Sequence, residues 1–304
     1  DYGSRFYSTG FYSSAYNRYY RDFCYTDLQI ANPTVNPISV TIPNDALFQR
    51  FMGVKYLLSD YGAPAGYTPC GQKSYFTIYR NDEVYSIGFG GHELMSLREY
   101  ETLSPADKEF AVLRYIVVDQ ELPDVYTSPY EPVTLDFQMS YKQILPGQFH
   151  VELGREKSTV VVSLPTSLQQ DVYVVDTVIA NRPDTRACIR INKIQNVLSG
   201  KNATLPNDNF QLRYMVSSAD PLDTMTIDFV GPSDYIASDF TFHRVSYDTI
   251  RKQGEHLSQM TDVCWKESNQ LTCSITMNQD GYFAATIPYD EGFQILVDGK
   301  ETEY

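Results

Sequence analysis

The most direct chemical signal in this sequence is a pair of adjacent carboxylates, Asp290 and Glu291, followed by Gly292. General acid/base catalysis of glycoside cleavage uses two carboxyl groups at a controlled separation. Neighbouring side chains in a turn point apart into water, and a glycine free to adopt positive φ is typical of a turn. We therefore expect a solvated turn here and assign no catalytic residue to it.

The segment from Gly88 to Glu93 is rich in glycine and contains His92. It lacks the Lys-Ser/Thr of a phosphate-binding loop and the spacing of a dinucleotide fingerprint. A flexible loop is the favoured interpretation, although its glycines leave room for a glycan to approach the backbone. No Gly-x-Ser-x-Gly elbow occurs in the sequence, so a serine hydrolase is unsupported.

No metal site or other cofactor is predicted. The histidines lie far in sequence from the cysteines, and no Cys-x-x-Cys pair occurs, so the spacing of a zinc site is absent. Asn207, Asp208 and Asn209 carry oxygen ligands that suit Ca²⁺, but they lack the regular spacing of a dedicated calcium loop. A plain turn is preferred, and a structural Ca²⁺ has no support.

Aromatic side chains near the start of the chain are the best candidates for ligand contact, in a sequence with 25 Tyr and 1 Trp. The apolar face of a sugar packs on such a ring, while its hydroxyls reach polar side chains. The residues with this chemistry are Tyr12, Tyr16, Tyr19, Tyr20 and Arg18. The alternative, which we favour, is that they pack the first segment onto the body of the protein or against a membrane part.

Cys264 and Cys273 form the one informative pair among the 5 cysteines. A two-residue turn between the strands that contain them would place the two cysteines directly opposite each other, at a position where side chains approach closely. Two interpretations stay open. The pair is a disulfide, which indicates an oxidising compartment, or it is two buried thiols on one face of a sheet.

The charge balance argues against nucleic acid as a partner. Lys and Arg number 24 against 38 Asp and Glu, a net charge of −14, and no basic run interrupts this excess. No apolar run is long enough for a membrane-spanning helix, and the first residues lack the features of a signal peptide. We expect a soluble piece excised from a longer protein.

The first part of the chain is expected to be a small α/β subdomain over residues 1–123. Asn44 is the predicted cap of a short helix that extends to Met52, and a buried strand follows at Val54–Leu58. Ser104, followed by proline, is the clearest helix start in the sequence, because serine caps a helix and proline suits its first position.

From residue 124 onward, short alternating strands predict an antiparallel β-sandwich over residues 124–304, with a jelly roll as one arrangement. The expected fold class is therefore mainly β. One helix, from Tyr247 to Leu257, interrupts the strands. The predicted strands include Val133–Tyr141, Phe149–Leu153, Val160–Val162, Val172–Val175, Cys188–Ile191, Phe210–Tyr214, Met225–Phe229, Tyr282–Ile287 and Phe293–Val297.

Three places in the sequence resemble the YfhO family of bacterial membrane proteins. Leu47–Leu58 is similar to the family's short helix followed by Gly-Val-Lys-Tyr and an apolar strand. Ile78–Asn81 with Gly88–Gly90 resembles its Tyr-x-Asn strand end and Gly-Phe loop. The strongest resemblance is Ile287–Phe293, continuing to Val297–Lys300, although the family usually has Trp where this chain has Phe.

This resemblance implies a polytopic GT-C-like glycosyltransferase that adds sugars to teichoic acids in the cell wall of a Gram-positive bacterium. Its catalytic carboxylate is expected in an early loop between transmembrane helices, which this chain lacks, so no catalytic residue is carried over. The expected function is an accessory domain on the extracytoplasmic face of the cell membrane. It would bind or orient a cell-wall glycan acceptor, with the transmembrane part of the same polypeptide as its partner. The competing class is a purely structural or protein-interaction module without a glycan site.

Overall fold

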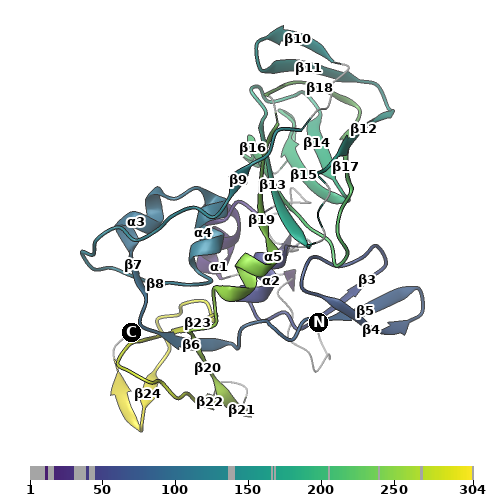
Figure 1. The fold of residues 1–304 in the computed structure, drawn as a ribbon. Helices are drawn as coiled ribbons and strands as arrows, with labels where there is room; N and C mark the ends of the chain where they lie inside the picture. Colours follow the sequence, from purple (N-terminus) through teal and green to yellow (C-terminus); the bar gives the residue numbers. More distant parts are fainter. Residues whose placement is uncertain are drawn as a thin grey trace.

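The computed structural model describes residues 11–12, 17–30, 39–40, 45–135, 141–165, 167, 169–204, 206–238, 240–267 and 270–302. In these residues the fold is mainly β, as predicted from the sequence. A β-sandwich (residues 131–246) forms the upper part of the molecule in Figure 1. A mixed part of helices and small sheets, built from the described residues before 131 and after 246 and called the lower part below, lies beneath it.

Two four-stranded sheets form the sandwich. Sheet I has the order β12 (Lys157–Ser163), β17 (Thr224–Val230), β14 (Arg186–Ile191) and β15 (Ile194–Ser199). Sheet II has the order β16 (Gln211–Val216), β13 (Asp171–Val178), β19 (Thr241–Ser246) and β9 (Glu131–Pro132). A three-stranded sheet at the upper end in Figure 1 consists of β10 (Lys142–Leu145), β11 (Gln148–Leu153) and β18 (Ser233–Ser238).

The strands of the sandwich pair in a nested order. β9 pairs with β19, β12 with β17, β13 with β16 and β14 with β15, all antiparallel. The first four of these strands therefore pair with the last four in reverse order along the chain. Successive pairs alternate between sheet II and sheet I. This winding is that of an eight-stranded jelly roll, one of the arrangements expected from the sequence.

Alternation along the strands places one face of each sheet in a shared apolar core. Because Ile227 and Phe229 of β17 are buried there, Asp228 between them lies on the outer face of sheet I. The same alternation puts Arg190 of β14 on that outer face. Core residues from both sheets include Val162, Tyr173, Val175, Ile189, Ile191, Leu212, Tyr214 and Phe242.

The outer face of sheet II is apolar as well, and the lower part covers it. Val172, Val174, Met215 and Val245 of this face belong to one buried cluster with side chains of the lower part. Their partners there include Leu47, Phe110, Leu113, Tyr247 and Ile250. The sandwich and the lower part are therefore joined by a common core.

The helices of the lower part are short. They are α1 (Arg18–Asp22), continued by a π-helical turn at Phe23–Asp27, α2 (Ala46–Phe51), α3 (Leu97–Thr102), α4 (Pro105–Ala111) and α5 (Tyr247–Lys252). Asp45 caps α2, because Leu47 N and Phe48 N both donate to its Oδ1 at 3.1 Å. The predicted cap, Asn44, lies outside the described residues. Ser104 caps α4 and Pro105 occupies its first turn, as predicted.

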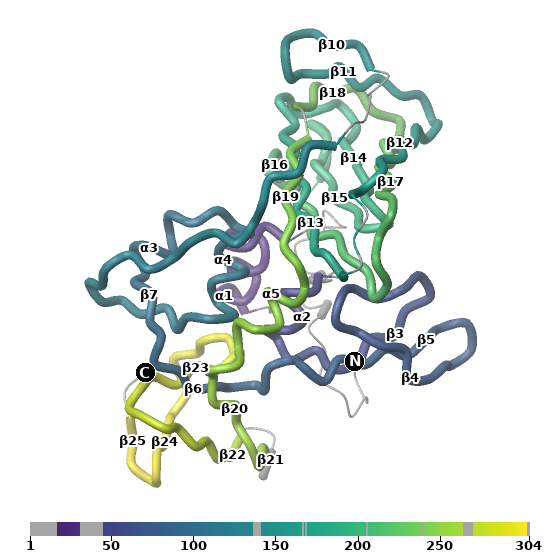
Figure 2. The backbone as a smooth tube through the Cα atoms, in the orientation of Figure 1, coloured from purple at the N-terminus to yellow at the C-terminus, as the bar shows by residue number. Residues whose placement is uncertain are grey.

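Small sheets complete the lower part, and the smooth backbone tube shows how they surround the helices (Figure 2). One three-stranded sheet has the order β3 (Tyr56–Ser59), β5 (Phe76–Arg80) and β4 (Thr68–Lys73). A second has the order β20 (Ser258–Gln259), β6 (Gly88–Gly91) and β23 (Tyr282–Ala285). The two-stranded ones are β1 (Phe11–Tyr12) with β2 (Ser39–Val40), β7 (Leu94–Ser96) with β8 (Ile116–Val118), β21 (Thr261–Glu267) with β22 (Gln270–Ser274) and β24 (Ile295–Val297) with β25 (Lys300–Thr302).

The glycine-rich segment expected to be a flexible loop is instead the buried central strand β6. A Cβ atom on Gly88 would lie 2.3 Å from the sulfur of Met260, and one on Gly90 would lie 2.6 Å from the sulfur of Met277. The glycines are therefore explained by the close packing of these side chains against the strand.

The segment after residue 246 lies with the first part of the chain. β6 pairs with β20 on one side and with β23 on the other. The division predicted from the sequence placed all of residues 124–304 in the sandwich, whereas these pairings place residues 258–259 and 282–285 in the lower part. The sandwich is thus inserted between two segments that fold together.

Buried charged groups lie at the junction between the two parts. Asp45, Glu109 of α4 and Arg213 of β16 are each at most 4% exposed, and Arg213 Nε donates to Asp176 Oδ1 at 3.0 Å. Burial raises the pKa of the Asp45 carboxyl to about 6. Burial, together with the neighbouring Asp45, raises the pKa of Glu109 well above its usual range. Charging both carboxyls therefore opposes folding.

Glu109→Gln should increase the free energy of unfolding relative to the unmodified chain, and the difference should grow with pH. Protonated Asp45 contributes its full stability below pH 3.8, the usual pKa of its carboxyl, and this contribution is lost as the pH rises through about 6. The pKa of Glu109 is also raised by burial, so ionisation of Glu109 causes a further loss of stability as the pH rises. The variant removes part of the loss, on the order of 1 kcal/mol near neutral pH. Urea unfolding of both proteins at acid and at neutral pH measures the difference.

Glu301→Gln on the exposed strand β25 is the matched control, because it removes the same charge from a solvated position. Its unfolding free energy should follow that of the unmodified chain at both pH values. A stability difference for Glu109→Gln that does not change with pH would contradict the assignment.

Candidate functional site

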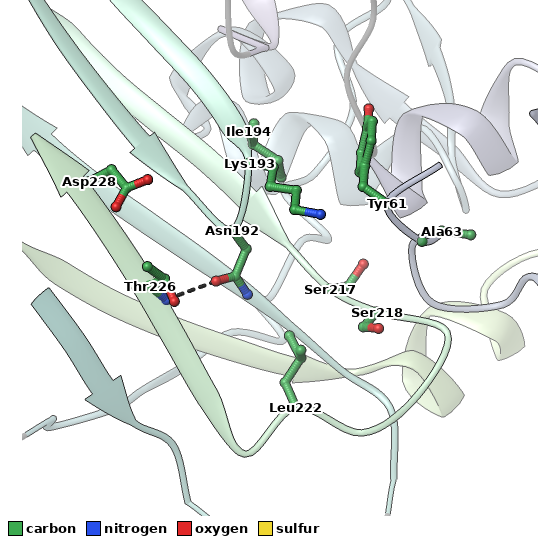
Figure 3. A pocket seen from close by; sticks show the side chains of 11 residues that line it. Tyr61, Ala63, Asn192, Lys193, Ile194, Ser217, Ser218, Leu222, Thr226 and Asp228 are labelled. Atoms are coloured by element: carbon green, nitrogen blue, oxygen red, sulfur yellow. Dashed lines mark hydrogen bonds between the residues drawn. The ribbon is translucent and has the colours of Figure 1, made fainter. Parts of the chain in front are cut away.

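A pocket of about 380 Å³ lies where three loops meet at one end of sheet I (Figure 3). One loop follows β3, one is the turn between β14 and β15, and one joins β16 to β17. The lining residues are Tyr61, Gly62, Ala63, Asn192, Lys193, Ile194, Ser217, Ser218, Leu222, Thr226 and Asp228. The pocket is therefore shared between the lower part and the sandwich.

The turn between β14 and β15 has two residues, because Ile191 pairs directly with Ile194. Both residues of the turn have positive φ, 42° at Asn192 and 72° at Lys193, which is the signature of a type I′ turn. Asparagine tolerates this conformation, whereas the second position strongly favours glycine. Lys193 thus occupies a backbone position that is unfavourable for a lysine.

The turn is held against β17. Thr226 N donates to Asn192 Oδ1 at 2.8 Å, the contact drawn as a dashed line in Figure 3. Asn192 N donates in return to Thr226 O at 3.0 Å. These two bonds fix the direction in which the turn presents its side chains.

Lys193 and Tyr61 form the mouth of the pocket. The Lys193 ammonium lies 5.4 Å from the centre of the Tyr61 ring, within the range of a cation–π contact. Tyr61 is 51% exposed. Partial burial and the nearby Asp60 raise the pKa of its phenol, so the hydroxyl stays protonated and can donate a hydrogen bond.

Hydrogen bonds tie the loop after Tyr61 to the sandwich. Ala65 N donates to Ser217 Oγ at 3.1 Å, and Ala219 N donates to Ala63 O at 2.9 Å. Gly66, with a φ of +87°, donates to Gln170 Oε1 at 3.0 Å. The wall that carries Tyr61 is therefore anchored to the opposite wall by backbone contacts rather than only by side-chain packing.

Asp228 is the one carboxylate in the lining of the pocket. Its side chain is 10% exposed, accepts a hydrogen bond from Thr159 Oγ1 at 2.8 Å and lies 3.1 Å from Lys157 Nζ. A single, already paired carboxylate does not provide the acid and base of glycoside cleavage. The described residues also contain no group of three or more His, Cys, Asp or Glu suited to a metal ion. An aromatic ring with hydroxyl, amide and charged groups suits binding of a polar ligand.

The structure places the aromatic residues predicted as ligand contacts elsewhere. Tyr19 is 48% exposed, and its ring lies 5.5 Å from that of Tyr289 in an edge-on arrangement. The Arg18 guanidinium lies 5.2 Å from the centre of the Tyr19 ring. Tyr20 is buried in a cluster with Cys24. Tyr16 and the side chain of Tyr12 lie outside what the structure describes.

The two acidic turns considered in the sequence have local roles. Asp290 Oδ1 accepts from Gly292 N at 2.8 Å, and both Asp290 and Glu291 are exposed, as in the solvated turn that was expected. Asn207 O accepts from Arg182 Nη1 at 2.7 Å, and Arg182 also pairs with Asp208. This arginine ties the Asn-Asp-Asn segment to the sandwich.

In the hairpin of β21 and β22, Glu267 pairs with Gln270, as a two-residue turn requires. An irregularity between Trp265 and Glu267 then shifts the register, so Cys264 lies opposite Thr272. Cys273 is an exposed, free cysteine. The direct Cys264–Cys273 pairing expected from the sequence is thus displaced by one residue.

The comparison with known families bears on the whole chain. The model described as "Bacterial membrane protein YfhO" matches residues 4–304. The chain belongs to the YfhO family. None of the helices among the described residues of this YfhO-family chain is long and apolar enough to cross a lipid bilayer.

Other comparisons are less informative for this YfhO-family chain. No curated protein matches it. The crystal structure of dimeric latent PorU from Porphyromonas gingivalis is similar over 63% of this chain and 21% of that chain, with 12% identity and a TM-score of 0.24. The chain therefore spans about a fifth of that protein's length, and a likeness at this TM-score does not bear on function.

The pocket residues were missed in the sequence because they are far apart along the chain. One local signal was present: Asn192 follows an alternating apolar strand and begins a two-residue connection to the next. Nothing local to Tyr61 indicates that it lies against residues more than a hundred positions later. Long-range assembly, rather than a motif, creates this site.

Lys193→Gly should stabilise the chain relative to Lys193→Ala. Both substitutions remove the ammonium group, but only glycine relieves the unfavourable positive φ at this position. The expected gain of the glycine variant over the alanine variant is about 1 kcal/mol. Urea or thermal unfolding of the two variants measures it, and equal stability would show that the turn is not strained.

Proposed function

We propose that this chain is an extracytoplasmic accessory domain of a membrane glycosyltransferase-like protein, and that it binds or orients a teichoic-acid-like glycan acceptor of the cell wall. Membership of a membrane-protein family supports a place at the cell membrane. The resemblance of its motifs to a GT-C-like enzyme supports the link to glycosyl transfer, with the transmembrane part of the same polypeptide as its partner.

The observation that carries this proposal is the exposed ring of Tyr61 at the mouth of a pocket lined by Asn192, Lys193 and two serines. An aromatic face suits the apolar side of a sugar, and the amide, hydroxyl and ammonium groups suit its polar substituents. Jelly rolls also occur in lectin domains.

The role proposed is binding rather than catalysis. Asp228, the carboxylate of the pocket, is held by Thr159 and Lys157 and has no second carboxylate beside it in the lining. Lys193 has a positive φ, which is an unfavourable backbone conformation for lysine. Such backbone strain is common at ligand-binding positions, and it supports a binding role for this side chain.

Tyr61→Ala should weaken binding of cell-wall glycan fragments to the isolated chain by about tenfold or more, because it removes the aromatic face of the pocket. Calorimetric titration with teichoic-acid fragments measures the affinity. Tyr75→Ala is the matched control, since Tyr75 is 70% exposed and outside the pocket lining.

Tyr19→Ala separates this site from the aromatic residues first suggested by the sequence. Loss of affinity in Tyr19→Ala but not in Tyr61→Ala would move the glycan site to the surface around Tyr289. Absence of binding to any fragment would overturn the proposal in favour of a structural or protein-interaction module.

A further inference from the structure

A row of four polar side chains crosses the whole of sheet I next to the pocket. Thr159 of β12 pairs with Asp228 of β17, Asp228 pairs with Arg190 of β14, and Arg190 pairs with Gln195 of β15. Each residue therefore lies directly opposite the next across all four strands. We refer to these four residues as the polar row.

The polar row lies on the outer face of the sheet. The neighbours of Asp228 and Arg190 along their strands, such as Ile227 and Ile189, are buried in the core of the sandwich. Side chains alternate between the two faces of a strand, so the row projects away from that core. The outer face of sheet II, by contrast, is covered by the lower part.

Hydrogen bonds hold the members of the row in place. Thr159 Oγ1 donates to Asp228 Oδ1 at 2.8 Å, and Arg190 Nη2 donates to Gln195 Oε1 at 3.0 Å. Lys157 Nζ also donates to Asp228 Oδ2 at 3.1 Å, so this carboxylate is held from two sides. A guanidinium has five N–H donors, so Arg190 keeps donors beyond its contact with Gln195. The row thus holds hydrogen-bonding side chains in fixed positions across the sheet.

The row is continuous with the pocket. Asp228 belongs to both, and Thr226, two residues earlier on the same face of β17, also lines the pocket. Val161, which is 62% exposed, lies opposite Thr226 and adds an apolar surface beside the row. With neighbouring strands about 4.8 Å apart, three intervals give the row a length of about 14 Å.

We infer that the pocket opens into an extended binding track, and that the track takes a linear polyol-phosphate polymer whose chain crosses sheet I along the polar row. This inference rests on the proposed function and adds to it a second binding region and a requirement for chain length. A short ligand occupies the pocket alone, whereas a longer one also contacts Arg190 and Gln195.

The test is the affinity of the isolated chain for poly(glycerol phosphate) as a dimer and as an octamer, measured by calorimetry. We expect the octamer to bind at least about tenfold more tightly than the dimer. Arg190→Ala should reduce this ratio to about threefold or less, whereas Arg98→Ala, an exposed arginine of α3 paired with Asp124, should leave it unchanged. Tyr61→Ala should weaken binding of both the dimer and the octamer.

The outcomes separate the two proposals. Dimer and octamer binding with equal affinity, or a length advantage that persists in Arg190→Ala, overturns the extended track and leaves the pocket in place. No binding of either oligomer overturns this inference together with the teichoic-acid acceptor role. If Arg190→Ala unfolds, Gln195→Ala gives the same comparison from the other member of the hydrogen-bonded pair.

Discussion

The packing of the lower part on the outer face of sheet II is the contact on which the rest of the structure depends. That face presents Val172, Val174, Met215 and Val245, which would be unfavourable in water. The lower part has the complementary need, because its short helices bury side chains such as Phe110 in the same cluster. Each part therefore completes the core of the other. The outer face of sheet I, which carries Asp228 and Arg190, lies on the opposite side of the sandwich from this contact.

The candidate site follows from this arrangement. Tyr61 belongs to the lower part, while Asn192 and Lys193 belong to the sandwich, so the pocket exists only when the two parts are joined. The bond from Ala65 N to Ser217 Oγ links the two walls close to the pocket. Because Asp45 and Glu109 are buried at the same junction, their ionisation is coupled to the contact that holds the walls together.

The sequence was informative where the signal is local. Alternating apolar residues predicted the strands of the sandwich, and Ser104 with Pro105 predicted the start of α4. It was uninformative where pairing is distant. The glycines of β6 carry no side-chain pattern that identifies a strand, and their partners in β20 and β23 lie more than 160 residues later. More than 130 residues separate Tyr61 from most of its pocket, so composition directed attention to the tyrosines near the start of the chain instead.

Strain at Lys193 links the fold to its proposed role. The nested ladder of the jelly roll needs a tight connection between β14 and β15, and a type I′ turn matches the twist of the two strands. Glycine would satisfy that geometry at the second position with less strain. Lysine there places an ammonium group over the Tyr61 ring, at the end of sheet I and close in sequence to Arg190 and Gln195 of the polar row. The residue at this position is therefore less favourable for folding than glycine, but its side chain reaches the pocket. This combination is expected where a residue serves ligand contact at some cost in stability.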